Sequence, residues 1–238
     1  VYDDEPETAG LMTTDTTELA SWIRSSDESE MHVIVHAIGD KANDWLLDVY
    51  EDVIGDHGPR DRRFRIEHAQ HLSPGALGRF AELGVIASMQ PYHAADDGRW
   101  AQKRIGPERI KTTYAFRSLL DAGATVAFGS DWTVAPLDPV EGIDAAVTRR
   151  TLDGANPNGW IPQERISLEE SLIAYTSAAA RAGYMEARVG TIEPGKLADL
   201  AVLSGDIFLM DEKELGSVHV DLTIVEGEVV YEHPAGGE

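Results

Sequence analysis

Three short stretches decide the fold, and the first is His32-Val33-Ile34-Val35-His36-Ala37-Ile38-Gly39-Asp40. The others are Phe64-Arg65-Ile66-Glu67-His68-Ala69-Gln70-His71 and Thr125-Val126-Ala127-Phe128-Gly129-Ser130-Asp131-Trp132. Each reads as a buried strand that ends on a side chain able to bind a metal: an imidazole, a second imidazole and a carboxylate. In a barrel of alternating strands and helices, the carboxyl ends of the strands share one mouth. The pattern therefore predicts a site for a divalent metal of the zinc type.

Strands and helices alternate through the first part of the chain. We expect strands at 33–35, 64–66, 85–89 and 125–128, and helices at 41–54, 72–83, 114–122 and 167–184. Residues 90–105 read as a polar loop at the mouth. Alternation of this kind indicates an α/β fold with parallel strands and right-handed crossovers.

The alternation of strands and helices gives way to short strands and turns after about residue 189. Residues 190–203 read as a turn and a strand, and 218–225 with 229–231 read as a hairpin around Glu226-Gly227-Glu228. We therefore predict two parts, a partial barrel over 1–189 and a small β-sheet part over 190–238, with a loose tail at 234–238.

Composition excludes several kinds of protein. The 238 residues include 42 acidic and 20 basic side chains, a net charge of −22, and no cysteine. Disulfides, a thiolate nucleophile and cysteine-ligated zinc are therefore excluded. We see neither a membrane-spanning apolar run nor a basic leader segment. Nucleic acid and anionic membranes are unsuitable partners for so acidic a surface. We expect a cytoplasmic protein adapted to high salt, because salt screens self-repulsion.

Five motifs together resemble the amidohydrolase superfamily. They are His36 in His-Ala-Ile-Gly-Asp, His68 in Glu-His-Ala-Gln, Met89-Gln90-Pro91, Asp131 in Gly-Ser-Asp-Trp, and Gly195-Lys196-Leu197-Ala198-Asp199-Leu200. The branch that these motifs resemble contains N-substituted formamide deformylases and proteins labelled exoenzyme regulatory proteins. The resemblance implies a metal-dependent (β/α)8 TIM barrel with a small β-sandwich. This chain would form the C-terminal half, with strands resembling the fifth to the eighth and part of the sandwich.

The resemblance also implies roles for individual residues. His36, His68 and Asp131 match the ligands that follow the fifth, sixth and eighth strands. The cofactor would be one or two divalent ions, with zinc favoured. The His-x-His pair and the Lys or Glu ligand that the superfamily places earlier are absent, so we expect an incomplete site and an incomplete, processed or trimmed beginning at Val1.

The implied chemistry is attack of a metal-activated water on a non-peptide carbon–nitrogen bond of a small molecule. Asp131 would be both a metal ligand and the catalytic group that takes a proton from the water. Gln90, His93 and Trp132 would bind substrate. We interpret Glu67 as a structural residue paired with Arg65 or Arg63, on the opposite face of its strand from His68, and His71 as a loop residue.

Two alternatives to an active hydrolase follow from the missing ligands. One is a non-catalytic or regulatory protein that keeps the amidohydrolase fold. The other is a truncated fragment stabilised by self-association. Four barrel strands leave open edges and an unfilled interior, so a homodimer could cover the incomplete barrel. A tightly held stoichiometric metal would favour an assembled site over both alternatives.

Overall fold

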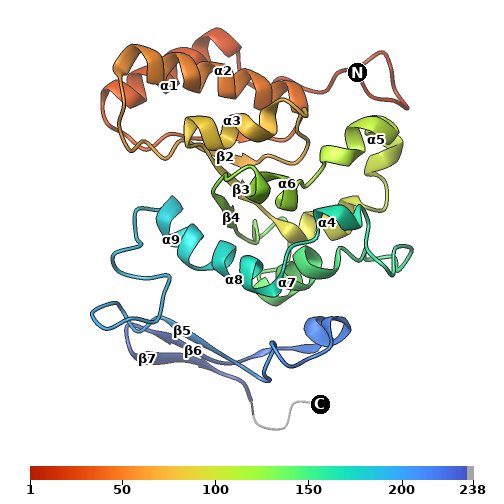
Figure 1. The fold of residues 1–238 in the computed structure, drawn as a ribbon, viewed down its shortest axis with the longest axis vertical. Helices are drawn as coiled ribbons and strands as arrows, with labels where there is room; N and C mark the ends of the chain where they lie inside the picture. Colours follow the sequence, from red (N-terminus) through yellow and green to blue (C-terminus); the bar gives the residue numbers. More distant parts are fainter. Residues whose placement is uncertain (235–238) are drawn as a thin grey trace.

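The computed structural model describes residues 1–234, so most of the tail predicted at 234–238 lies outside the described residues. Its central element is a parallel sheet of four strands in the order β1-β2-β3-β4. Figure 1 labels β2, β3 and β4 of this sheet. The four strands are β1 (Ile34–Ala37), β2 (Arg65–His68), β3 (Ile86–Met89) and β4 (Val126–Phe128). The predicted parallel pairing is thus confirmed, with each strand shifted by one or two residues at its start or end.

Helices connect and cover the strands. The α-helices are α1 (Thr16–Glu28), α2 (Asp40–His57), α3 (Ala76–Leu83), α4 (Pro91–Asp97), α5 (Ala101–Arg109), α6 (Phe116–Asp121), α7 (Pro139–Thr148), α8 (Leu168–Tyr175) and α9 (Ser177–Ala182). The 3₁₀ helices within residues 1–234 are η1 (Ile110–Thr112), η2 (Pro162–Glu164) and η3 (Glu212–Ser217). Among the residues described, no helix combines the length and apolar character that a membrane crossing requires.

The main core lies on one face of the parallel sheet. Ile66, Ala87 and Val126 of the strands are nearly fully buried there against apolar residues of α2, α3 and α6. Figure 1 shows α1, α2 and α3 stacked on this side of the sheet. Burial of apolar surface on this scale is the main stabilising term of such a domain.

The other face of the sheet is more open. Because paired residues of parallel strands share a face, Ile34, Arg65 and Ile86 lie side by side, as do His36, Glu67 and Ser88. At the β4 end, Ala182 of α9 covers Ile86 and Ala127. At the β1 end, Ile34 is 43% exposed and His36 is exposed. In the part of the chain that the structure describes, β1 pairs only with β2.

Three expectations for the helices were wrong. Residues 90–105 contain α4 and the start of α5 rather than a loop, and Pro91 stands at the first position of α4, where its missing N–H is tolerated. The helix expected from residue 72 begins at Ala76. The long helix expected over 167–184 is two helices, because Thr176 leaves helical geometry at φ −117° and ψ −89°.

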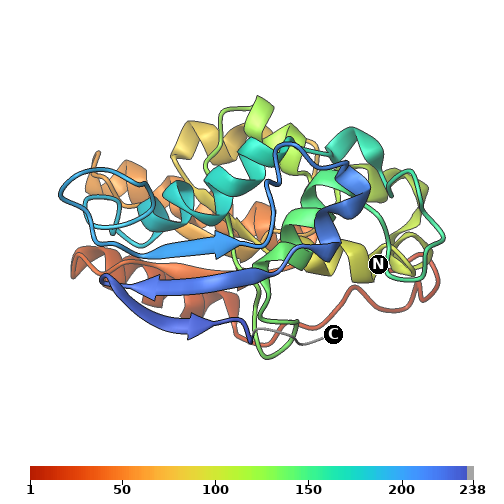
Figure 2. The ribbon, with the colours of Figure 1, turned by 90° about the horizontal axis from the view of Figure 1, so that it is seen from below.

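The second sheet is antiparallel and consists of β5 (Leu200–Leu203), β6 (Val220–Val225) and β7 (Glu228–Glu232) (Figures 1 and 2). The hairpin between β6 and β7 is confirmed, and Glu226 and Gly227 both have positive φ, as tight hairpin turns require. A separate apolar cluster joins Val140 and Ile143 of α7 to Leu215 of η3. The division of the chain near residue 189 stays a prediction.

A buried ion-pair network holds the N-terminal helices. Asp27, at the end of α1, is 0% exposed and accepts hydrogen bonds from Arg60, from Arg62 and from Nδ1 of His57. Burial raises the pKa of Asp27, but the hydrogen bonds from Arg62 and His57 outweigh it, so that the pKa is lowered overall. The network joins α1, the end of α2 and the segment that leads into β2.

Candidate metal centre

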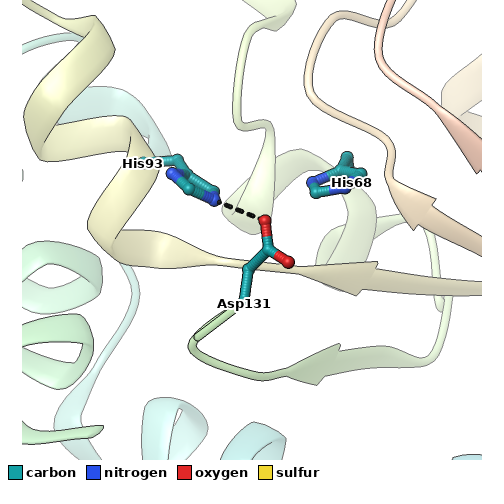
Figure 3. A group of neighbouring side chains, drawn as sticks. All are labelled: His68, His93 and Asp131. Atoms are coloured by element: carbon teal, nitrogen blue, oxygen red, sulfur yellow. Dashed lines mark hydrogen bonds and ion pairs between the residues drawn. The ribbon is translucent and has the colours of Figure 1, made fainter. Parts of the chain in front are cut away.

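Three side chains converge where the carboxyl ends of the parallel strands meet. His68 ends β2, His93 lies on α4 and Asp131 follows β4. One ligand atom from each residue lies within 4.8 Å of the others. Nε2 of His93 is 3.2 Å from Oδ2 of Asp131, and Figure 3 shows the Asp131 carboxylate between the two imidazole rings. Two imidazoles and a carboxylate form a donor set that zinc-type ions accept.

His36 lies beside this group rather than within it. Its ring centroid is 4.5 Å from that of His68, and the angle between the two ring planes is 70°. His36 extends from the open face of β1 and is exposed. The structure therefore places His68 and Asp131 together as predicted, places His36 next to His68, and adds His93. The roles of all four residues stay predictions.

Unusual backbone geometry directs the side chain of His68 into the mouth. Glu67 shares a face with His36, so regular alternation would send the next side chain toward the helix-covered face. His68 and Ala69 instead have φ of 78° and 44°, in the left-handed region. Asp131 has φ of 59°. Such conformations cost about 1–3 kcal/mol each in non-glycine residues, and they concentrate at functional sites.

Electrostatics keep His68 in the form that binds metals. Burial lowers the pKa of His68, and the charge of neighbouring His36 lowers it further. The imidazole is therefore neutral at neutral pH, with a free lone pair. Among the described residues, the buried Nδ1 of His68 has no hydrogen-bond partner. An orphaned buried nitrogen next to a second imidazole and a carboxylate fits a cation site.

The other two residues predicted to bind substrate, Gln90 and Trp132, lie on the chain segments that carry His93 and Asp131. Gln90 lies between β3 and α4 and is 5% exposed, and within the described residues its buried Oε1 has no hydrogen-bond partner. Trp132 follows Asp131 and is 65% exposed. Gln90 thus offers an unused polar group, and Trp132 offers an exposed aromatic surface.

The pairing expected for Glu67 and the position expected for His71 are supported, whereas His68 does not lie on the face opposite Glu67. Arg65 Nε lies 2.5 Å from Oε1 of Glu67, so Glu67 is paired as expected. His71 lies outside the group, with Nδ1 3.0 Å from Oγ1 of Thr113. Burial lowers the pKa of His71 to about 4, so this imidazole is neutral.

The sequence places His93 at the mouth as a substrate contact but not in the metal-binding group, because a loop over 90–105 gives its side chain no fixed position. The usable signal was Pro91. A proline directly after a strand is typical of the first position of a helix. A helix that starts at Pro91, with only Gln90 between it and the end of β3, carries His93 as its third residue and keeps it at the mouth.

Comparison with known proteins decides the family. Residues 1–231 match the sequence pattern described as the Amidohydrolase family. The chain belongs to the amidohydrolase family. It is 45% identical over 231 residues to the protein LONG AFTER FAR-RED 3 of Arabidopsis thaliana, covering 97% of this chain and 39% of that protein. It is 33% identical over 204 residues to the N-substituted formamide deformylase of Arthrobacter pascens, covering 85% and 37%.

A solved structure agrees with the family assignment of this amidohydrolase chain. An uncharacterized metal-dependent hydrolase from Pyrococcus horikoshii ot3 superposes with a TM-score of 0.77 and 30% identity, covering 89% of this chain and 42% of that one. The chain therefore spans about two fifths of the length of these relatives. The resemblance inferred from the five sequence motifs is confirmed.

Proposed function

We propose that this amidohydrolase chain supplies part of the active site of a metal-dependent hydrolase that cleaves a non-peptide carbon–nitrogen bond. The convergence of His68, His93 and Asp131 carries the proposal. The relative from Arthrobacter pascens is named for deformylation of N-substituted formamides, which are amides, and this supports the bond type.

His68 and Asp131 would hold the ion, and zinc is the metal that we propose for this donor set. The third imidazole is His36 in the motif-based prediction and His93 in the observed geometry. A bound zinc ion supplies a Lewis acid and lowers the pKa of water toward about 7.

The side chains of this chain have distinct tasks in the proposed reaction. The Asp131 carboxylate accepts the proton that the attacking water loses and then delivers it to the leaving nitrogen. Where His36 is the third ligand, Nε2 of His93 donates to Oδ2 of Asp131, as in the observed hydrogen bond, and fixes the direction of the carboxylate. Gln90 binds a polar group of the substrate through its unused amide oxygen or the adjacent N–H, and Trp132 shields the mouth from water.

We further propose that the open face of the sheet at Ile34 and His36 is covered by the rest of a family-length polypeptide. The exposure of these two residues and the single partner of β1 support a missing neighbour. Further ligands of the kind that the superfamily uses would come from that neighbour. Alternatively, a second copy of this chain covers the open face.

Metal analysis tests the proposal. We expect the full-length polypeptide that contains this chain to retain stoichiometric zinc after dialysis against a weak chelator, measured by atomic emission. His68→Asn is expected to lower zinc affinity by about 100-fold, since a ligand is lost outright.

Parallel His36→Asn and His93→Asn variants identify the third imidazole as the one whose loss weakens binding more. Glu67→Gln, which alters a paired acid outside the group, is the control and should leave the zinc content unchanged. Wild-type protein free of zinc, with nickel, cobalt and manganese also absent, would contradict the proposed function. If the 238-residue chain alone binds zinc and sediments as a dimer, a second copy is the cover.

We also propose adaptation to a salt-rich cytoplasm, on the basis of the net charge of −22. We expect the melting temperature to rise steadily from low salt to molar KCl, because the Debye length falls to about 3 Å at 1 M salt and self-repulsion is screened. Calorimetry in a KCl series measures this. A melting temperature that does not change with salt would argue against the adaptation.

A further inference from the structure

One carboxylate joins the segment that carries His68 to the helix that carries His93. Asp97 lies four residues after His93, one turn further along α4, and is 9% exposed. Gln70 lies two residues after His68 and is 6% exposed. The side-chain amide of Gln70 donates from Nε2 to Oδ2 of Asp97 at 3.0 Å. The segments that carry His68 and His93 are therefore joined by a direct, buried hydrogen bond.

Tyr114 completes the contact. Its hydroxyl donates to the same Oδ2 of Asp97 at 2.6 Å and also contacts Nε2 of Gln70. The backbone N–H of Tyr114 donates to the carbonyl oxygen of Gln70 at 2.7 Å. Arg149 is buried and holds the carbonyl oxygen of Tyr114 at 2.9 Å. Oδ2 of Asp97 is thus a buried acceptor shared by two donors from separate segments.

The contact between Gln70, Asp97 and Tyr114 lies next to the strained turn that orients the side chain of His68. The left-handed residues His68 and Ala69 directly precede Gln70. On one side the turn is fixed by the N–H of Ala69, which donates to the carbonyl oxygen of Ala37 at 3.0 Å. On the other side Gln70 is fixed by Asp97 and Tyr114. A strained conformation persists only where the surrounding structure holds it in place. Asp97 helps to hold it through its hydrogen bond with Gln70.

We propose that Asp97 is a positioning residue, whose Oδ2 locks the His68 turn to α4 and so sets His68 and His93 on either side of Asp131. The proposal rests on the proposed function for its catalytic meaning, and its structural part is measurable without metal. Asp97 itself lies outside the group of candidate ligands. Its effect on a bound ion would act through the histidines, as partners behind metal ligands commonly do.

The decisive comparison is Asp97→Leu against Asp97→Asn in the full-length polypeptide. Leucine removes the acceptor, whereas asparagine can place its amide oxygen where Oδ2 lies and accept both hydrogen bonds. We expect Asp97→Leu to weaken Zn²⁺ binding by about 10-fold or more, measured by competition with a chromophoric chelator. We expect Asp97→Asn to restore affinity to within about threefold of wild type, and Tyr114→Phe to fall between them.

Amide hydrogen exchange of the metal-free protein provides the second measurement. We expect Asp97→Leu to speed exchange at the amides of Ala69 and Tyr114 by about 10-fold, and Asp97→Asn to leave both near wild type. Asp96→Leu is the matched control, because Asp96 neighbours Asp97 on α4 but pairs at the surface with Arg99. It should change neither measurement.

Unchanged exchange in Asp97→Leu overturns the proposal, as does an Asp97→Asn variant that binds Zn²⁺ as weakly as Asp97→Leu. Faster exchange in Asp97→Leu together with a wild-type protein that binds no metal supports the positioning and contradicts the proposed function instead.

Discussion

Asp131→Asn in the full-length polypeptide is expected to lower kcat for amide hydrolysis by about 10³-fold. Loss of general acid–base catalysis alone costs about 10²–10⁴-fold. Asparagine keeps the shape of the side chain and an oxygen that can accept the hydrogen bond from Nε2 of His93. It cannot take the proton of the attacking water. The measurement is the rate of release of formate from an N-substituted formamide, or of the matching acid from the best amide in a panel.

Zinc content must be measured on the same samples, since the proposal expects Asp131→Asn to retain metal in part. Asp96→Asn is a suitable control, because Asp96 is paired at the surface with Arg99 on the helix that carries His93. Its kcat should match that of wild type. Turnover by Asp131→Asn within about threefold of wild type would remove Asp131 from the mechanism.

Asp27→Asn is expected to reduce the free energy of unfolding by about 3–5 kcal/mol, the cost typical of breaking a buried ion pair from one side. The substitution leaves Arg62, which is 7% exposed, facing a neutral amide, and it weakens the contacts of Arg60 and His57. Urea denaturation at neutral pH measures the change. For a chain of this size the melting temperature should fall by about 10 °C.

The pH dependence of stability gives an independent check on Asp27. Its pKa is lower in the folded protein than in the unfolded chain, so the carboxylate stabilises the fold above the ordinary value of about 3.9. That contribution disappears as the pH falls through the lowered pKa of the folded state. Wild type should therefore lose stability more steeply than Asp27→Asn below about pH 4.

Asp56→Asn serves as the matched control for the stability measurement. Asp56 pairs with Arg24 at the surface, where their side chains are 62% and 40% exposed. Exposed pairs of this kind contribute less than about 1 kcal/mol. A loss in Asp27→Asn as small as that in Asp56→Asn would show that the buried network does not support the fold.

The sequence predicts the parallel sheet correctly and brings His68 and Asp131 close together, for a simple physical reason. Each strand is a short apolar run that ends beside a polar residue, and the carboxyl ends of parallel strands lie at one edge. His68 and Asp131 therefore come together once the strands pair in order. These inferences need only local pattern and the handedness of crossovers.

The orientation of His68 could not be predicted. Regular alternation assigns it to the face opposite Glu67, and the left-handed φ of His68 and Ala69 reverses that assignment. Left-handed conformations are expected at glycine and, less often, at asparagine or aspartate. Histidine adopts them more often than most residues but still uncommonly, and alanine gives no such signal, so the turn could not be read from the sequence.

The break between α8 and α9 could not be predicted for a related reason. Residues 168–182 are rich in good helix formers, which favours one continuous helix. The packing contacts instead require α8 and α9 to run in different directions. Tyr175 contacts Phe128, with ring centroids 5.3 Å apart, whereas Ala182 packs on Ile86 and Ala127 at the other face of the sheet. Tertiary contacts therefore override the local preference at Thr176.

The unpaired side of β1 has a consequence for handling the chain by itself. In the described part of the chain that strand has one neighbour, so its remaining amide and carbonyl groups form a template for edge-to-edge growth into oligomers or aggregates. Repulsion between copies that each carry −22 charges opposes such growth in dilute buffer. Concentrated salt removes that protection. Under the proposed salt adaptation it also stabilises each copy, so the conditions expected to favour folding also favour precipitation unless another polypeptide segment occupies the edge.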